Sequence, residues 1–425
     1  MKWILASLIL CFSVLVNANV FTPQDIRVLK ANFMENITAN GAIMASPSQD
    51  EPDYYYDWVR DSAIAMGLIA SWYETQLNPH DKKLLQQYVQ WVETIQHQPT
   101  PINGSDILGE PKFYLDGRPY DGPWGRPQND GPALRALALT KFANQLLKNN
   151  ETNYVRTHLY GGGLNPMTMG TIKMDLEYLA HHWQEKNFDL WEEVYGHHFF
   201  TAMVQRKALL EGAALARKLE DPKAAVFYER QANRLKQRLN LHIDSNQGTL
   251  LATLPPHTGP QKYQELDSAV LLAVLLGYQQ DGFFAPDNPY LIATIEALKK
   301  QFKELFPVND RHHKAILFGR YPGDTYDGYH TDGLGNPWFI PTASMAEYHY
   351  RLADMHAKQN GTGNQIEEHI QQGDAYLKLI KHYTKDLHMK EQINRATGKQ
   401  QGAASLTWNY VAVLRAIEAR SAIRL

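Results

Sequence analysis

Apolar residues recur at helical spacing along most of the chain, often directly after a helix-start signal. The dipeptides Thr22-Pro23, Asn78-Pro79 and Asp221-Pro222 each place a capping side chain before a proline that suits the first helical turn. Apolar side chains three and four positions apart then form one face of each predicted helix. These faces comprise Ile26, Leu29, Phe33 and Ile37; Leu85, Tyr88, Val89 and Val92; and Val226, Phe227, Leu235 and Leu239.

The same periodicity predicts further helices separated by long loops, whereas alternating strand patterns are scarce. The helices are expected at residues 131–149, 171–184, 201–219, 264–278, 290–305, 340–357, 364–385 and 405–422, and the loops at 99–130, 157–170, 307–339 and 386–404. Loops this long inside a compact domain usually carry function. Because no low-complexity linker divides the chain, we predict one all-α domain over residues 19–425.

The first eighteen residues have the pattern of a secretory signal peptide. Lys2 gives a basic start, residues 4–16 are an apolar run, and the small side chains up to Ala18 suit cleavage after that residue. The apolar run is shorter than the roughly 20 residues that a membrane span requires. Cys11, the single cysteine, falls inside this segment. We therefore expect a secreted monomer, periplasmic or extracellular, without disulfides and without a membrane anchor after cleavage.

Composition and charge exclude several classes of protein. The chain has 42 Lys and Arg against 45 Asp and Glu, a net charge of −3, which disfavours nucleic acid as its ligand. It contains no cysteine pair, no His-Glu-x-x-His helix and no Gly-x-Ser-x-Gly elbow, so neither a metal site nor serine hydrolysis is expected. The glycines at 161–163 lack the lysine of a phosphate loop. The 23 Tyr and 9 Trp, against 15 Phe, supply more rings with polar edges than core packing requires.

Three acids, Asp189, Glu192 and Glu193, surround Trp191 just before a predicted helix. Like charges this close raise the pKa of at least one carboxyl, and an indole face excludes water from it. A carboxyl that stays protonated at neutral pH is what a general acid for glycosidic cleavage requires. The alternative is that these are ordinary acids near a helix start, where the helix dipole favours them.

The segment 54–61 brings Tyr54, Trp58, Arg60 and Asp61 together in a run of aromatic and charged residues. A core helix fits this run poorly, because Arg60 and Asp61 would have to be buried together or leave the rings exposed. A sugar subsite fits it well, since the rings would stack on pyranose faces and the charged groups would hydrogen-bond vicinal hydroxyls. The alternative is an aromatic cluster at the start of a helix.

Two further loop segments, 124–132 and 319–339, combine Gly, Pro and Asn with aromatic and charged residues. The Gly, Pro and Asn positions are typical of turns. For Trp124, Arg320 and Trp338, contact with a ligand and incidental turn chemistry are both open.

The dipeptide Glu391-Gln392 lies in a charged loop, and Glu391 precedes Trp408 by seventeen residues. A lone glutamate in such a loop is usually solvated surface. Its charge alone therefore does not separate Glu391 from Glu367 or Glu368.

Taken together, these segments resemble the glucoamylases, the α-glucan exo-hydrolases of glycoside hydrolase family 15. The shared motifs are Tyr-x-Tyr-x-Trp-x-Arg-Asp at 54–61, Trp-Gly-Arg-Pro-Gln-Asn-Asp-Gly-Pro-Ala at 124–133, Asp-Leu-Trp-Glu-Glu-x-x-Gly at 189–196, Gly-Arg-Tyr-Pro-x-Asp at 319–324, Gly-Asn-Pro-Trp-Phe at 335–339 and Leu-Thr-Trp at 406–408. The resemblance implies an (α/α)6 barrel, two concentric layers of six helices, with its active site in a pocket formed by loops at one end. It also implies release of glucose from the non-reducing ends of starch-like α-1,4-glucans by inversion, without a metal or organic cofactor.

Matching motif to motif assigns roles to individual residues. Glu192, the first acid after Trp191, matches the family's general acid, and Glu391 matches the general base that activates water. Inversion places two such carboxyls roughly 6.5–9.5 Å apart to admit that water. Asp189 corresponds to an auxiliary acid near the pocket.

The resemblance also implies a set of substrate contacts. Tyr54 would stabilise the developing oxocarbenium ion, Glu193 would hold the next sugar, and Gln392 would help to orient water. The remaining contacts clamp hydroxyls of the terminal glucose (Arg60, Asp61 and Arg320) or line the pocket (Trp58, Trp124, Trp191 and Trp338).

The chain departs from the family pattern at three places, one of which is Asn187, where relatives commonly carry a small loop residue before the acidic motif. Gly323 stands where relatives often carry an acid, and the segment 327–334 is longer than the corresponding link. The sequence has no Ser/Thr-rich linker and no starch-binding domain, so soluble dextrins and maltooligosaccharides are the expected substrates. Two alternatives are open: the same fold acting on isomaltose-type or trehalose linkages, and a non-catalytic glucan-binding protein.

Overall fold

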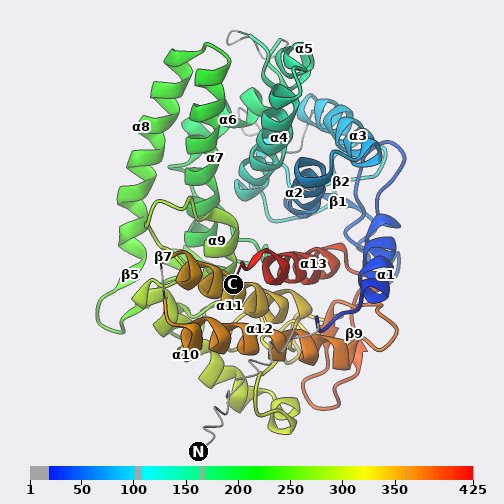
Figure 1. Cartoon of the computed structure of the whole chain (residues 1–425), viewed down its shortest axis with the longest axis vertical. Coiled ribbons are helices and arrows are strands. Elements are labelled where there is room, and N and C mark those ends of the chain that lie inside the picture. The colour runs from blue at the N-terminus through cyan, green and yellow to red at the C-terminus, as the bar shows by residue number, and fades with distance from the viewer. Residues whose placement is uncertain are drawn as a thin grey trace, which may run out of the picture.

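Helices follow one another along most of the chain, with short strands at the connecting loops (Figure 1). The structure is a computed structural model that describes residues 19–99, 101, 107–162, 165, 168–359 and 361–424. The signal peptide predicted at 1–18 lies outside the described residues.

Six helices of the described chain form an inner ring. They are α2 (Val59–Gln76), α4 (Asp130–Lys148), α7 (Phe199–Lys218), α9 (Ala269–Gly277), α11 (Phe339–Lys358) and α13 (Thr407–Ala422). Each packs against the next in this order, and α13 packs against α2, so the ring closes. Because neighbours surround each inner helix, most of its side chains are buried; α9, for example, has no polar residue at all.

Six further helices in the described part of the chain cover the ring from outside. They are α1 (Pro23–Met34), α3 (Pro79–Gln96), α6 (Thr171–His182), α8 (Pro222–Leu239), α10 (Pro289–Leu305) and α12 (Gly363–Tyr383). Each packs mainly on one inner helix: α3 on α2, α6 on α4, α8 on α7, α10 on α9, α12 on α11, and α1 on α13. In Figure 1 the blue α1 accordingly lies beside the red α13, although they stand at opposite ends of the chain. The architecture is an (α/α)6 barrel, which confirms the predicted fold.

The helix starts read from the sequence are confirmed, but one predicted face is wrong at Val226, although Leu235 and Leu239 of the same face are buried. The side chains of Thr22, Asn78 and Asp221 each accept a hydrogen bond from a first-turn backbone N–H, and each precedes a proline. On α8, however, Val226 is 62% exposed, whereas Tyr228 is fully buried. Two positions correspond to about 200° around a helix, so the buried face of α8 lies almost opposite to Val226.

The inner helix α2 was not expected from the sequence, and the argument against a core helix at Arg60 and Asp61 is wrong. Both residues lie in the first turn of α2, and Arg60 is only 5% exposed. No side chain of the described residues caps the start of α2, and twelve of its eighteen residues are buried, so neither a start signal nor a single apolar stripe marks this helix. The charges are tolerated because Asp130, at the start of α4, pairs with Arg60.

Short antiparallel strands connect these helices, as the scarcity of strand patterns predicts. β1 (Asp57–Trp58) pairs with β2 (Lys112–Phe113), β5 (Ile243–Asp244) with β6 (Thr249–Leu250), and β8 (Gln392–Ile393) with β9 (Gln400–Gln401). β4 (Tyr195–His198) lies between β3 (Asn187–Phe188) and β7 (Thr253–Thr258). Single helical turns complete the described elements: α5 (Thr152–Tyr154), the π-helix η2 (Val155–Tyr160), and the 3-10 helices η1 (Ile107–Gly109), η3 (Asn240–His242), η4 (Tyr263–Glu265) and η5 (Pro307–Arg311).

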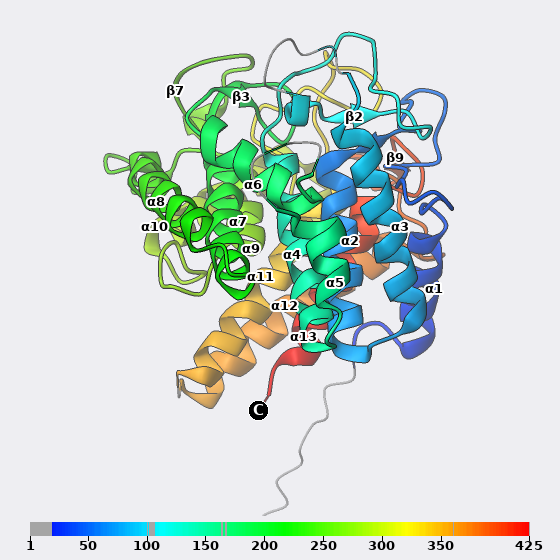
Figure 2. The ribbon, with the colours of Figure 1, turned by 90° about the horizontal axis from the view of Figure 1, so that it is seen from above.

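The strands gather at the end of the barrel where the inner helices begin. Figure 2 shows β2, β3, β7 and β9 along one end of the helices, with the C-terminus at the other. β1 leads directly into α2, and β4 leads directly into α7. The long loops therefore converge on one mouth of the ring. None of the described helices combines the length and the apolar character that crossing a membrane requires.

Candidate active site

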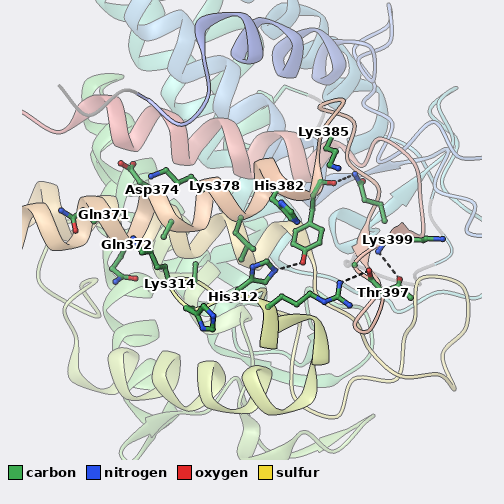
Figure 3. A pocket seen from close by; sticks show the side chains of 18 of the residues that line it. His312, Lys314, Gln371, Gln372, Asp374, Lys378, His382, Lys385, Thr397 and Lys399 are labelled. Atoms are coloured by element: carbon green, nitrogen blue, oxygen red, sulfur yellow. Dashed lines mark hydrogen bonds between the residues drawn. The ribbon is translucent and has the colours of Figure 1, made fainter. Parts of the chain in front are cut away.

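Two cavities differ sharply in their lining. The larger, about 1510 Å³, lies between α12, η5 and residues 397–400 (Figure 3). Its lining is mainly basic and amide side chains, and its two acids are already engaged: Asp374 accepts from Tyr350, and Asp386 accepts from the backbone N–H of His388. Among the described residues, no two carboxylates flanked by aromatic rings line this larger cavity.

The smaller cavity, about 380 Å³, lies at the mouth of the ring and is lined by aromatic and charged side chains. Of the thirteen site residues predicted from the sequence, eleven line it, and Asp189 and Gln392 do not. The eleven are Tyr54, Trp58, Arg60, Asp61, Trp124, Trp191, Glu192, Glu193, Arg320, Trp338 and Glu391. The ring closure thus brings together residues that stand as far apart in the sequence as Tyr54 and Glu391.

Glu391 is fully buried directly before β8 and is held by two phenolic hydroxyls. Tyr54 Oη donates to Glu391 Oε1 at 2.9 Å, Tyr326 Oη donates to Oε2 at 3.1 Å, and the two hydroxyl oxygens are 3.0 Å apart. Burial raises the pKa of Glu391 to about 7, against the lowering effect of these hydrogen bonds. Glu391 is therefore a carboxyl of raised basicity, fixed at both oxygens and facing the cavity.

Glu192 lies in the turn between β3 and β4, with a left-handed backbone (φ 68°) that a non-glycine residue adopts only when its surroundings hold it. Its Oε1 accepts hydrogen bonds from Arg60 Nη2 at 3.2 Å and from Gln128 Nε2 at 3.0 Å. Since both donors use the same oxygen, Oε2 is the oxygen left to carry a proton.

Arg60 is fixed by residues of two helix starts. Its Nη1 donates to Gln128 Oε1 at 2.9 Å and to Asp130 Oδ2 at 3.1 Å, and its Nε lies 3.5 Å from Asp61 Oδ2. Burial raises the pKa of Asp61 to about 7, although Arg60 acts in the opposite direction. The pair presents a rigid arrangement of charged hydrogen-bonding groups at the cavity wall.

Arg320 joins the opposite loop to the acid-bearing turn. Its Nε and Nη2 donate to the two oxygens of Asp324 at 2.8 and 2.6 Å, and Nη2 also donates to Glu193 Oε1 at 2.8 Å. Tyr321 Oη donates to the other oxygen of Glu193 at 2.5 Å. Burial raises the pKa of Glu193, while Arg320 acts to lower it. Glu193 and Arg320 therefore form a preorganised polar edge of the cavity.

Asp189 lies beneath the turn rather than on the cavity wall. It is 2% exposed; Oδ1 accepts from the backbone N–H groups of Glu193 and Val194 at 2.8 and 2.9 Å, and Oδ2 accepts from Lys262 Nζ at 3.0 Å. Burial acts to raise the pKa of Asp189, but the Lys262 charge and these hydrogen bonds hold it at about 2. Asp189 therefore stays ionised and binds the turn that carries Glu192.

Gln392, the first residue of β8, follows Glu391 and lies behind the cavity wall. The side-chain oxygen Oε1 of Gln392 accepts a hydrogen bond from Asn336 Nδ2 at 2.9 Å. The backbone of Gln392 pairs with that of Trp338 in an isolated β-bridge. Its Nε2 is buried and has no hydrogen-bond partner within the described ranges of the chain. Gln392 thus ties the segment after Glu391 to the loop that ends at Trp338.

The predicted tryptophans pack in edge-to-face or tilted pairs around the cavity. The ring centroids of Trp58 and Trp124 are 5.8 Å apart, those of Tyr54 and Trp58 are 5.6 Å apart, and those of Trp191 and Trp338 are 6.0 Å apart. Such tilted pairs fix each ring against its neighbour, so the cavity keeps its shape without a ligand.

Lys112 does not line the cavity, but it contacts two rings that do, Trp58 and Trp124, and sequence reasoning missed it. Its ammonium lies in a cage of four rings, 3.7 Å from the Trp124 centroid, 4.5 Å from that of Trp58, and 4.1 Å from those of Tyr56 and Tyr120. Burial lowers the pKa of Lys112 to about 8. A single lysine in a loop gives no sequence signal, because the cage forms only when β2 pairs with β1.

Tyr326, Gln128 and Trp408 were also left out of the predicted site. Tyr326 and Trp408 line the cavity, and Gln128 bonds both Arg60 and Glu192. Gln128 and Trp408 stand inside the shared motifs, and Tyr326 stands two residues after one of them. The motifs therefore marked these segments, but not the direction in which each side chain points.

Two glutamates, one held by tyrosine hydroxyls and the other by an arginine, thus face one ring-lined cavity. Paired carboxyls can give a proton and take one in the same reaction, and fixed rings with charged edges suit a sugar. The (α/α)6 barrel and this site together define a glycoside hydrolase.

Known proteins are similar to this chain along almost its whole length. The family model described as "Glycosyl hydrolases family 15" matches residues 26–418. A curated glucoamylase of Blastobotrys adeninivorans is 36% identical over 430 residues, 91% of this chain and 68% of that protein. A probable glucoamylase of Schizosaccharomyces pombe is 35% identical, covering 90% of this chain and 86% of that protein. The solved structure of a Saccharomycopsis fibuligera glucoamylase has a TM-score of 0.84 at 31% identity, covering 94% of this chain and 95% of that chain.

The chain therefore belongs to glycosyl hydrolases family 15. The resemblance found in the sequence motifs is confirmed at the level of the family.

Proposed function

We propose that this chain is an exo-acting glucan 1,4-α-glucosidase, a glucoamylase, which releases glucose from the non-reducing ends of starch, glycogen or maltooligosaccharides. The observation that carries the proposal is that Glu192 and Glu391 line one cavity of about 380 Å³ in different hydrogen-bond settings. A pocket of this size, rather than a long groove, favours attack at a chain end. Family membership and the glucoamylase relatives support the same assignment.

In the proposed reaction, Glu192 donates the proton on Oε2 to the glycosidic oxygen as the bond from that oxygen to C1 breaks. Glu391 takes a proton from a water molecule, whose oxygen attacks C1 from the opposite face, so an α-linkage yields β-glucose. Burial raises the pKa of Glu391, which makes its carboxylate a stronger proton acceptor than an exposed glutamate. Tyr54 holds this carboxylate beside the sugar ring, where positive charge develops.

The cavity wall supplies the proposed substrate contacts. Asp61, with Arg60 behind it, and Arg320 would bind hydroxyls of the terminal glucose, and Glu193 would bind the next sugar. The rings of Trp58, Trp124, Trp191 and Trp338 would shape the pocket. Asp189 and Gln392 would act one layer behind, by holding the segments that carry the two glutamates.

The test is glucose release from maltotriose, with the anomer followed by proton NMR before mutarotation. We expect the wild-type protein to release β-glucose, and both Glu192→Gln and Glu391→Gln to lose at least about 10²-fold in kcat, since each removes a proton-transfer group. Release of α-glucose would refute inversion. A Glu192→Gln variant that keeps most of its activity would refute the assignment of the acid.

Two further assays test which glycosidic linkage the protein prefers and whether it hydrolyses its ligand at all. A panel of maltose, isomaltose and trehalose separates the α-1,4 enzyme from one tuned to another α-glucoside, because pocket shape sets linkage choice. Tight calorimetric binding of maltose without hydrolysis would instead indicate a glucan-binding protein.

The remaining parts of the proposal concern the state of the protein. The reaction as written uses no metal or organic cofactor, so dialysis against EDTA is expected to leave the rate unchanged. We propose that residues 1–18 are removed on export and that the catalytic domain from residue 19 is a monomer. N-terminal sequencing of the exported protein and light scattering test these two statements.

A further inference from the structure

The turn that carries Glu192 is held by hydrogen bonds from within. Asp189 N donates to Val194 O, and Glu192 N donates to Asp189 O, both at 2.9 Å. Asp189 Oδ1 accepts from the next two backbone N–H groups, those of Glu193 and Val194. The left-handed backbone of Glu192 persists because these contacts on either side fix it.

The other oxygen of Asp189 is bound by Lys262, which comes from the segment between β7 and α9. The Lys262 side chain is 1% exposed, and its Nζ lies 3.0 Å from Asp189 Oδ2 and 2.6 Å from Asp267 Oδ2. Its ammonium also lies 4.4 Å from the centroid of the Tyr321 ring, whose hydroxyl binds Glu193. A buried ammonium is costly to desolvate, so an apolar residue would fill this place more cheaply if only packing were needed.

The second carboxylate on Lys262 reaches the residue next to the acid. Asp267 Oδ1 accepts from Trp191 Nε1 at 2.9 Å and from Ala269 N at 2.7 Å, at the start of α9. Lys262 therefore joins two anchors of the turn: the carboxylate that binds its backbone, and the carboxylate that binds its indole. Both anchors lead to Glu192, although Lys262 itself does not line the cavity.

We propose that Lys262 is a positioning residue for the general acid, which sets the place of Glu192 by tying Asp189 and Asp267 to the turn that bears it. The inference rests on the proposed function, in which Glu192 protonates the leaving group. Without the ammonium, two buried carboxylates repel each other and the turn loses its anchor. A displacement of about 1 Å at the acid costs on the order of 10²-fold in rate.

Two substrates separate positioning of the acid from general support of the fold. Maltotriose needs a proton on its leaving oxygen. In α-glucosyl fluoride the C1–F bond breaks with fluoride leaving as the anion, while Glu391 still takes a proton from the attacking water. We expect Lys262→Met to lower kcat for maltotriose by about 10²-fold, and kcat for α-glucosyl fluoride by much less.

Matched variants complete the experiment. Lys207→Met removes another largely buried lysine, whose Nζ donates to Leu276 O away from this turn, and it should leave the ratio of the two rates as in wild type. Glu192→Gln, like Lys262→Met, should lower kcat for maltotriose more than kcat for α-glucosyl fluoride. If Lys262→Met does not fold, Lys262→Met combined with Asp267→Asn restores the net charge of the cluster and should show the same selective loss.

The outcomes are distinguishable. An equal loss on both substrates in Lys262→Met, or in its Asp267→Asn combination, with the fraction of folded enzyme measured by circular dichroism, would overturn the positioning role. A wild-type protein that hydrolyses α-glucosyl fluoride but not maltotriose would overturn the proposed function instead.

Discussion

The hydroxyl of Tyr326 stabilises the charged form of the buried Glu391, and its removal should therefore shift the pH dependence of catalysis. Tyr326 Oη donates to Glu391 Oε2 at 3.1 Å, and Tyr54 holds the other oxygen at 2.9 Å. In Tyr326→Phe the ring stays in the wall and only the donor is lost. A hydrogen bond to the ionised carboxylate lowers its pKa, so deletion of that bond raises the pKa of Glu391 further.

The size of the shift follows from the strength of the lost bond. A hydrogen bond to a charged group contributes about 1.5–3 kcal/mol, and one pKa unit corresponds to about 1.4 kcal/mol. Because 3.1 Å is long for an O–H···O contact and Tyr54 still donates to the carboxylate, we take the lower end. The pKa of Glu391 should rise by about one unit.

The assay is kcat/KM for maltotriose from pH 3 to 9, whose acidic limb reports the base of the free enzyme. The base must be ionised to accept a proton, so a higher pKa moves the acidic limb to higher pH. Tyr321→Phe is the matched control, since Tyr321 bonds Glu193 instead of Glu391 and should leave this limb in place. An unchanged limb in Tyr326→Phe, or one displaced to lower pH, would refute the reasoning.

Three further predictions concern the supports of the site. The pKa of Asp189 is held at about 2, below its ordinary 3.8, so its ionisation contributes about 2 kcal/mol of stability above the unfolded-state pKa, which is lost as pH falls through about 2. Urea titrations should therefore show Asp189→Asn less stable than wild type at pH 6, with the difference roughly halved at pH 3; a pH-independent difference would contradict this. In Gly402→Ala (φ 79°), a Cβ would overlap the Glu391 carboxylate, so kcat should fall at least about tenfold, and an unaltered kcat would refute the close approach. Lys112→Met keeps the ring contacts but removes the ammonium, and should raise KM for maltotriose about tenfold with kcat nearly unchanged; an unchanged KM would exclude a role in binding.

The outer helices could be predicted because each carries its own signal. A cap such as Thr22 before a proline, followed by an apolar face, identifies α1 without reference to any other element. The error at Val226 has the same origin, because the period is clear on α8 but the choice of buried face depends on which side meets α7. Among the six inner helices, α2 was the one not predicted, since no side chain within the described ranges caps its start and no exposed polar face marks its period.

The residues of the candidate site also divide into those that sequence motifs marked and those that only tertiary contacts place. The resemblance of their motifs to the family predicted sugar contacts for Arg60, Glu192 and Arg320, and the structure gathers the three at one cavity. Lys112 carried no motif, and its aromatic cage exists only through the pairing of β1 with β2. Asp189 belongs to a motif, but its side chain points to Lys262 beneath the turn. The neighbouring residues in the sequence do not determine that direction.

The sequence by itself determined the helical class, most helix boundaries and the clusters of rings and carboxyls in the loops, because these depend on local chemistry and short-range periodicity. The resemblance to the family pointed to Glu391, but only the tertiary structure shows that Glu391, and neither Glu367 nor Glu368, is a buried carboxyl at the cavity. Glu391 meets Tyr54 and Tyr326 only when the ring of inner helices closes, whereas Glu367 and Glu368 lie on the outer helix α12. A carboxyl gains raised basicity from removal of water and from distant donors, and both are properties of the closed barrel rather than of the segment that carries the residue.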